Sequence, residues 1–210
     1  MGLDFGAQDD LTALTLLFHE GGEFQILTRF FCTANKIDAV KNNSQHITYM
    51  KWTRDEYIEV AGDEITDLDR VEEVIDELIK TYRVRSITYD PSFIVHLIEK
   101  LSKKYMGRGK GFLNPFTNNA KNFTPPMIEF QKWVKNAELE TYGNPVLEWM
   151  AGNVNVMVTG KDYIHPNKQK AEGKIDGIVA ALYSVDGYLN DKFKDSGAKY
   201  MIIGGEDFKL

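Results

Sequence analysis

The chain has 210 residues, of which 43% are hydrophobic and 27% charged, as in globular proteins with one well-buried core. This length is short for two domains, so we expect a single domain over residues 1–210. No stretch approaches the ~18 apolar residues of a membrane span, and one cysteine, Cys32, excludes an internal disulfide. A single cysteine fits a reducing compartment such as the cytosol.

The formal net charge of −6 is distributed unevenly along the chain. Residues 54–77 include eleven acidic and two basic residues, whereas residues 78–178 include fifteen basic and nine acidic ones. The second segment contains the basic run Lys100–Lys110, which is either a phosphate-contacting surface or a solvated helix end. The net charge therefore does not exclude a nucleic-acid partner.

The N-terminal part of the chain predicts an antiparallel β-meander. Its three strands are rich in Leu, Ile, Phe and Thr and are predicted at 2–5, 11–18 and 24–31. Gly21 and Gly22 predict a tight turn between the second and third strands. The connection over 36–51 is predicted to be partly helical, and a short extended piece follows at 57–61.

Helices and strands alternate in the next part of the chain. Asp67 or Asp69 is suited to cap a helix that runs to Tyr82, with apolar residues at helical spacing and its acidic residues facing solvent. A compact strand at 84–89 then ends at Asp90, and Pro91 suits the first turn of a helix over 92–106.

The remaining sequence begins with its longest irregular stretch, residues 107–126. The elements predicted after it are a helix over 127–139, strands over 146–150 and 154–159, a polar connector over 163–170 and a closing helix over 174–189. Long irregular loops in small domains are often functional. We therefore expect residues 107–124 or 159–170 to gate a binding groove.

This order of elements resembles the ribonuclease H-like fold, an α/β fold. Its mixed sheet has three antiparallel strands followed by parallel strands, and helices flank the sheet. The first and fourth strands of such a sheet lie side by side, about 4.8 Å apart. Asp4 and Asp90, which each end an apolar segment, would then be neighbours at one sheet edge. The closing helix would bring Asp176 to the same point.

Three converging carboxylates predict a divalent-metal site. Carboxylates are costly to bury unless they are paired, hydrogen-bonded or bound to metal, and oxygen ligands suit Mg²⁺ or Mn²⁺. Two such ions can clamp a scissile phosphate. We therefore predict that Asp4, Asp90 and Asp176 are the catalytic residues and metal ligands, with Asp10 as a further ligand. Taken singly, each aspartate could instead hold a turn, cap a helix or pair with a lysine.

Motifs along most of the chain also carry a family resemblance. They are Gly2-Leu-Asp-Phe-Gly with Asp10-Leu-Thr-Ala, Thr88-Tyr-Asp, Asn144-Pro-Val-Leu-Glu-Trp-Met-Ala-Gly-Asn and Lys174-Ile-Asp-Gly-Ile-Val-Ala-Ala. In this order they resemble the C-terminal nuclease domain of the tailed-bacteriophage large terminase subunit. The two motifs that begin at Asn144 and Lys174 are the more specific ones.

The resemblance implies an endonuclease that uses two Mg²⁺ or Mn²⁺ ions to cleave double-stranded viral DNA during genome packaging, in the host cytoplasm and without a membrane partner. It assigns the acidic triad to Asp4, Asp90 and Asp176, with Asp10 as accessory. The implied partners are double-stranded DNA, the portal or procapsid, the small terminase subunit and an N-terminal ATPase domain of the same protein. Because the chain has no ATPase motif, we expect it to be a domain excised from a longer chain.

Cleavage by such a nuclease is expected to be largely independent of sequence, because phosphate contacts carry little base information. The residues predicted to make these contacts are Lys103, Lys104, Arg108, Lys110, Lys121, Lys168 and Lys170.

Three other interpretations remain open. A Holliday-junction resolvase or transposase-like nuclease core shares the acidic geometry and would prefer branched DNA or transfer strands. An actin-like phosphotransfer domain also opens with an Asp-x-Gly strand, but usually needs two related domains and an adenosine-binding Gly-rich motif. The last is a non-catalytic scaffold. Metal-dependent nicking of plasmid DNA, lost when each aspartate of the triad is replaced, separates most of these interpretations.

Overall fold

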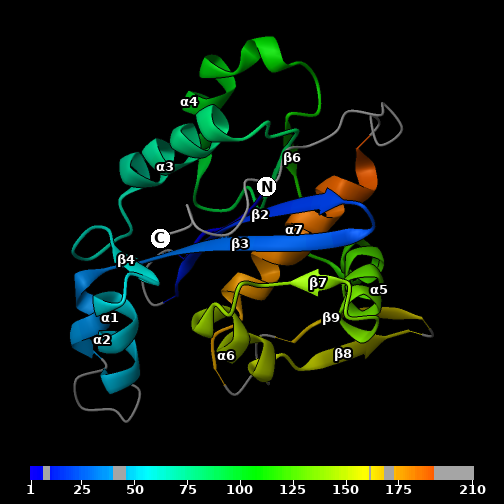
Figure 1. The fold of residues 1–210 in the computed structure, drawn as a ribbon. Coiled ribbons are helices and arrows are strands. Elements are labelled where there is room, and N and C mark those ends of the chain that lie inside the picture. The colour runs from blue at the N-terminus through cyan, green and yellow to red at the C-terminus, as the bar shows by residue number, and fades with distance from the viewer. Residues whose placement is uncertain (7–9, 40–45, 161, 168–172, 192–210) are drawn as a thin grey trace.

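A mixed β-sheet forms the centre of the protein in the computed structural model, which describes residues 1–6, 10–39, 46–160, 162–167 and 173–191 (Figure 1). Its strands are β1 (Gly2–Asp4), β2 (Thr12–Glu20), β3 (Glu23–Cys32), β4 (Ile58–Val60), β5 (Ile87–Tyr89), β6 (Leu113–Pro115) and β7 (Leu139–Glu140). A separate two-stranded sheet consists of β8 (Val156–Thr159) and β9 (Tyr163–Pro166). Within these described ranges, no helix is long and apolar enough to cross a membrane.

The strand order of the large sheet is β4-β3-β2-β1-β5-β6, and β7 pairs with β3. The pairs β1–β2 and β2–β3 are antiparallel, whereas β1–β5, β5–β6 and β3–β4 are parallel. A tight turn at Gly21 and Gly22, both with positive φ, joins β2 to β3. The predicted α/β fold is confirmed: a three-stranded antiparallel meander is extended by parallel strands and flanked by helices.

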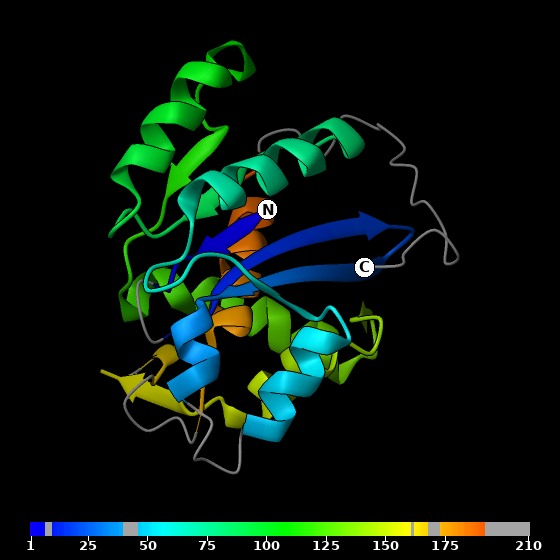
Figure 2. The same cartoon turned by 90° about the vertical axis from the view of Figure 1, so that its left-hand side faces the viewer.

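Helices cover both faces of this sheet (Figures 1 and 2). The helices are α1 (Ala34–Ala39), α2 (His46–Arg54), α3 (Leu68–Thr81), α4 (Val95–Lys104), α5 (Ala120–Lys135), α6 (Pro145–Asn153) and α7 (Asp176–Asn190), with a 3₁₀ turn at Met106–Arg108. One apolar cluster joins the sheet to α5, α6 and α7, and a second joins it to α3 and α4. Successive side chains of a strand point to opposite faces, so Ala13 belongs to the first cluster and Leu14 to the second.

Helix α7 crosses the sheet at very short distance, because glycines line its path. A Cβ atom on Gly2 of β1 would lie 2.0 Å from the carbonyl oxygen of Ala180, and one on Gly177 would lie 2.7 Å from the ring of Phe30 in β3. Near the far end of the helix, a Cβ on Gly187 would lie 2.9 Å from the Thr88 hydroxyl in β5. The helix therefore runs from β3 across β1 to β5.

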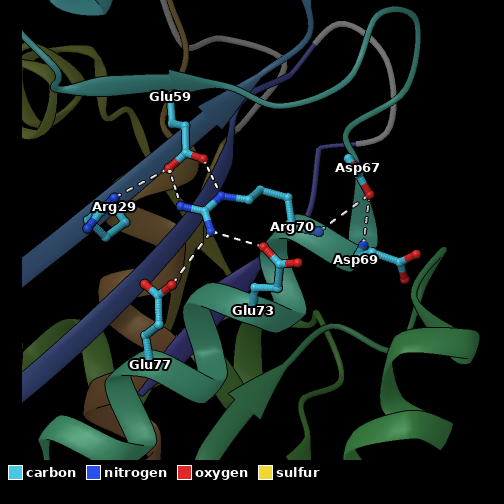
Figure 3. Close-up of polar contacts among 7 residues, drawn as sticks. All are labelled: Arg29, Glu59, Asp67, Asp69, Arg70, Glu73 and Glu77. Carbon is cyan, nitrogen blue, oxygen red and sulfur yellow. Dashed lines mark hydrogen bonds and ion pairs between the residues drawn. The ribbon is translucent and has the colours of Figure 1, made fainter.

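Many acidic residues of α3 are paired rather than only solvated. Arg70 contacts Glu59 of β4 and, on its own helix, Glu73 and Glu77 (Figure 3). The side chain of Asp67 caps the helix, accepting hydrogen bonds from the backbone N–H groups of residues 69 and 70. The prediction of a capped helix with an apolar buried face is confirmed. Its acidic side faces solvent at Asp69, Glu73 and Glu77, as predicted, whereas Asp76 is buried.

One predicted strand is a helix in the structure. The apolar segment 146–150 is helical and belongs to α6, whereas we expected a strand. Asn144 caps this helix by accepting hydrogen bonds from the backbone N–H groups of Val146 and Leu147, and Pro145 occupies its first turn. Capping residues and proline at a helix start outweigh the strand preference of one short apolar run.

The long stretch 107–126 is not a loop throughout: it contains β6 and the first turns of α5, with two prolines inside that helix. Helix α4 begins at Val95 rather than directly after Pro91, because the Asp90 carboxylate and Phe93, at φ 67°, form a separate turn. The segment predicted as a polar connector includes β9, which pairs with β8.

Candidate active site

Asp4 and Asp90 are adjacent at one edge of the sheet. Parallel strands β1 and β5 pair Gly2 with Thr88 and Leu3 with Tyr89, so the next position brings Asp4 beside Asp90. Gly2 and Thr88 face helix α7, as their close contacts with it show. Because side chains alternate along a strand, Asp4, two residues after Gly2, faces α7 as well. Asp90, two residues after Thr88, faces α7 for the same reason.

Asp176 opens helix α7 at the same edge. In the strand register, Asp4 pairs with Ala13 and Ala13 pairs with Phe30, which places the three residues in one row across the sheet. The ring of Phe30 packs against Gly177, the residue after Asp176. The start of α7 is therefore two strand spacings of about 4.8 Å from Asp4, a distance of roughly 10 Å across the sheet. Asp4 and Asp176 are buried, with 6% and 3% exposure.

Asp10 lies just before β2 and forms an ion pair with Lys174, which stands two residues before Asp176. The pKa of Tyr49 is raised, first by burial and then by the negative charges of Asp176 and Asp10. The ion pair with Lys174 places Asp10 at the Asp176 side of the site. Lys174 and Tyr49 were not predicted as site residues; Lys174 was visible only as part of the Lys-Ile-Asp-Gly motif.

Both carboxylate oxygens of Asp90 accept hydrogen bonds. The backbone N–H of Ser92 donates to Oδ1 at 2.9 Å, and the side-chain amide of Asn118 donates to Oδ2. The amide oxygen of Asn118 in turn accepts the hydroxyl proton of Tyr183 at 2.7 Å. Neither Asn118 nor Tyr183 was predicted as a site residue, because Asn118 lies in the stretch predicted to be irregular and Tyr183 has the spacing of an ordinary core position of a helix.

The pKa of Tyr183 is raised as well. Burial raises its pKa, and the charges of Asp4 and Asp90 raise it further, although the hydrogen bond to Asn118 acts in the opposite direction. The phenol therefore remains protonated and can donate to Asn118 at any pH of physiological interest. The strand register places Asp4 beside Asp90, and the ion pair with Lys174 places Asp10 near Asp176.

The chemistry of these donors fits a hard divalent cation, since all four are carboxylates and come from separate segments. In the part of the chain that the structure describes, no three His, Cys, Asp or Glu side chains lie close enough together to hold a metal ion. Carboxylates repel one another at short range, and a cation between them removes that repulsion. Metal binding by Asp4, Asp10, Asp90 and Asp176 thus stays a prediction.

The predicted DNA-contacting residues differ in their surroundings. Lys103 lines a cavity of about 320 Å³ together with Tyr89 and Pro91, and Asp90 is not among the residues that line it. Lys104 forms ion pairs with Asp76 and Glu72 of α3, so it also joins α4 to α3.

Arg108 lies over the ring of Phe112 at 5.4 Å. Lys110 and Lys121 are exposed, whereas Lys168 and Lys170 lie outside the described residues.

Comparison with known proteins identifies the family. A family model described as "Terminase large subunit, endonuclease domain" matches residues 1–190. The chain belongs to this family. Its terminase relatives include the large terminase subunit of Enterobacteria phage HK97, which is 26% identical over 200 residues; the match covers 95% of this chain and 39% of that protein. Protein YmfN of Escherichia coli (strain K12) is 26% identical over 169 residues, covering 77% of this chain and 36% of that protein.

A solved terminase structure shares the fold. The crystal structure of the HK97 bacteriophage large terminase superposes with a TM-score of 0.76 at 24% identity, covering 88% of this chain and 38% of that one. The mixed sheet flanked by helices is therefore the fold of a terminase nuclease. The chain spans less than two fifths of the length of these relatives.

Proposed function

We propose that this terminase nuclease domain is a metal-dependent endonuclease that hydrolyses phosphodiester bonds of double-stranded viral DNA during genome packaging. Family membership supports nuclease activity in general. The metal-dependent mechanism rests on one observation in particular: the strand register, the α7 crossing and the Asp10–Lys174 pair bring Asp4, Asp90, Asp176 and Asp10 to one sheet edge.

The four aspartates would hold two Mg²⁺ or Mn²⁺ ions, which, when bound, would supply activation of water and stabilisation of the leaving oxygen. Asp4 would hold metal together with Asp90, which lies beside it, and Asp176 at the start of α7. Ser92 and Asn118 hold the Asp90 carboxylate in one orientation. Lys174 restrains Asp10 as an accessory ligand.

DNA would approach from the side of α4 and the segment that follows it. The exposed Lys103, Lys110 and Lys121 offer positive charge for phosphates. Residues 107–124 connect α4 to α5 and carry Asn118, so this segment is the better placed of the two predicted gates. Lys104 is the weakest candidate of the basic set, because it is already paired with carboxylates of α3.

The assignment to viral packaging carries further expectations. The phage relative, matched both by sequence and by structure, is the large terminase of phage HK97. We therefore propose that the domain acts with an N-terminal ATPase domain, the portal or procapsid and the small terminase subunit, in the host cytoplasm.

A plasmid-cleavage assay tests the mechanism. Supercoiled DNA is incubated with the protein in Mg²⁺, in Mn²⁺ and with chelator, and the variants Asp4→Asn, Asp90→Asn and Asp176→Asn are compared with wild type. We expect cleavage only with metal and a loss of at least about 100-fold in each variant, as is usual for loss of an essential charged group. Cleavage that survives chelation, or that is insensitive to all three substitutions, would contradict the proposal.

Glu20→Gln is the matched control. This exposed carboxylate ends β2, seven residues beyond Ala13, the register partner of Asp4, and therefore about 23 Å away. We expect it to cleave like the wild type. A linear duplex and a four-way junction are digested in parallel, since preference for the junction would favour a resolvase-like nuclease instead.

A further inference from the structure

We propose that Asn118 is a positioning residue for Asp90, and that Tyr183 holds Asn118 in place, so that helix α7 orients the Asp90 carboxylate. The inference rests on the proposed function, in which Asp90 binds metal. It assigns a role to two side chains that do not themselves touch the reacting phosphate.

The hydrogen bonds define a single chain of contacts. The Tyr183 hydroxyl donates to the amide oxygen of Asn118 at 2.7 Å, which leaves the amide NH₂ of Asn118 to donate to Oδ2 of Asp90. The backbone N–H of Ser92 donates to the other oxygen, Oδ1, at 2.9 Å. Each carboxylate oxygen of Asp90 thus has one donor, and the plane of the carboxylate is fixed from two sides.

Tyr183 is a rigid support for this chain of contacts. It is fully buried, and its ring packs against those of Phe116 and Phe123, with ring centroids 4.8 and 6.1 Å away. Its hydroxyl is protonated because burial and the neighbouring carboxylates disfavour the phenolate. A buried ring with a single polar partner loses little conformational entropy on orienting Asn118.

The same helix also carries Asp176. Tyr183 lies seven residues after Asp176, about two helical turns, and therefore on the same face of α7. The contact from Tyr183 through Asn118 to Asp90 thus ties Asp90 of the sheet to the helix that supplies Asp176. Movement of α7 relative to β5 would change the distance between two proposed metal ligands.

The side chain of Asn118 is not needed to build the surrounding backbone. Helix α5 is capped by the neighbouring residue Asn119, whose side chain accepts from the backbone N–H of Asn122 at 2.9 Å. The side chain of Asn122 in turn donates to the backbone oxygen of Thr117 at 2.9 Å. These contacts fix the segment without Asn118. Among the described residues, the side-chain amide of Asn118 forms hydrogen bonds only with Asp90 and Tyr183.

A calorimetric titration with Mn²⁺ in the absence of DNA tests this role separately from catalysis. We expect Asn118→Ala to weaken Mn²⁺ binding roughly 10-fold, the lower end for residues that orient a metal ligand, because Asn118 is solvent-exposed. Tyr183→Phe removes one neutral hydrogen bond and should weaken binding roughly 5-fold. The double variant should bind no more weakly than Asn118→Ala, because Tyr183 acts through Asn118.

Tyr188→Phe is the matched control, since it removes another hydroxyl of α7 that contacts His19 at 3.3 Å and not Asn118. Thermal melting of each variant shows whether the fold is retained, and Asn118→Ser, which is too short to bridge, replaces Asn118→Ala if that variant unfolds. Wild-type Mn²⁺ affinity in both Tyr183→Phe and the folded Asn118 variant would overturn the inference, as would fully additive losses in the double variant.

Asp90→Asn in the same titration separates the two claims. If it weakens Mn²⁺ binding while the Asn118 and Tyr183 variants do not, the positioning role fails and the metal site stands. If Asp90→Asn binds Mn²⁺ as the wild type does, the proposed function fails, and the positioning role fails with it.

Discussion

Replacing Gly2 with alanine would test the packing of β1 on helix α7, the contact that positions Asp4. A Cβ atom at residue 2 would lie 2.0 Å from the carbonyl oxygen of Ala180 and 2.6 Å from the backbone nitrogen of Ser184. Ordinary contacts of a Cβ atom are 3.4–4 Å, so β1 or α7 would have to move by more than 1 Å. Both obstacles are helix backbone, which cannot rotate away as a side chain can.

The expected cost follows from this geometry. Extra methylene groups in a well-packed core cost about 1–3 kcal/mol, and a clash with backbone on a buried helix belongs at the upper end. We therefore expect Gly2→Ala to lower the free energy of unfolding by about 3 kcal/mol. Because Asp4 is two residues along the same strand, DNA cleavage should fall as well, even at temperatures where the variant is folded.

Urea denaturation followed by tryptophan fluorescence measures this change. Gly152→Ala is the matched control: Gly152 lies in α6, and a Cβ atom there would meet nothing within 4 Å. The control should be stabilised by up to about 1 kcal/mol, because alanine restricts the unfolded chain. A Gly2→Ala variant with the wild-type urea midpoint would refute the close packing of β1 on α7.

Three further predictions concern stability. Phe93→Gly should stabilise the fold by about 1 kcal/mol in urea denaturation, because Phe93 is 77% exposed yet has φ 67°, a conformation costly for a bulky residue. Tyr105→Phe should destabilise the fold by about 1 kcal/mol, since the Tyr105 hydroxyl donates to the Asp76 carboxylate. Burial and this hydrogen bond raise the pKa of Tyr105 to about 12. The stability advantage of the wild type over Tyr105→Phe is therefore complete below pH 10 and is lost as the pH rises towards 12. Asp186→Asn should stabilise the protein at pH 7, because burial raises the pKa of Asp186 and the stability tied to its protonated form is lost as the pH rises through that pKa.

Each of these has a clear contrary result. A Phe93→Gly variant less stable than the wild type would show that the aromatic ring makes a contact worth more than the backbone strain. An unchanged difference between wild type and Tyr105→Phe from pH 8 to 12 would show that the phenol does not titrate as stated. An Asp186→Asn variant whose stability has the same pH dependence as the wild type between pH 3 and 7 would remove the effect assigned to Asp186.

The sequence predicted the central sheet well, because its strands are long or strongly apolar. The Leu, Ile, Phe and Thr content of β2 and β3 and the Gly21-Gly22 turn located the meander, and Asp67 located the start of α3. Short elements were harder: strand β6 has only three residues, and the strand-like segment 146–150 is helical because Asn144 caps it. A three-residue strand is set by its pairing with β5, and no local pattern reports that pairing.

The residues of the candidate site likewise include some that the sequence predicted and some that it did not. Asp4 and Asp90 end strands that could be recognised, so the order of the elements predicted that the two residues lie side by side. Asn118 and Tyr183 could not be found, because their contact joins residues 65 positions apart and neither lies in a recognisable motif. Likewise, the pairing of Lys104 with Asp76 depends on how α4 packs on α3, which separate patterns of charge do not reveal.

Anomalous diffraction from crystals soaked in Mn²⁺ is the most direct test of the metal site. We expect strong peaks at the edge of the sheet, in contact with the carboxylates of Asp4, Asp90 and Asp176, and their loss in crystals of Asp176→Asn. Absence of Mn²⁺ there at saturating concentration, or peaks bound only by carboxylates elsewhere on the surface, would contradict it.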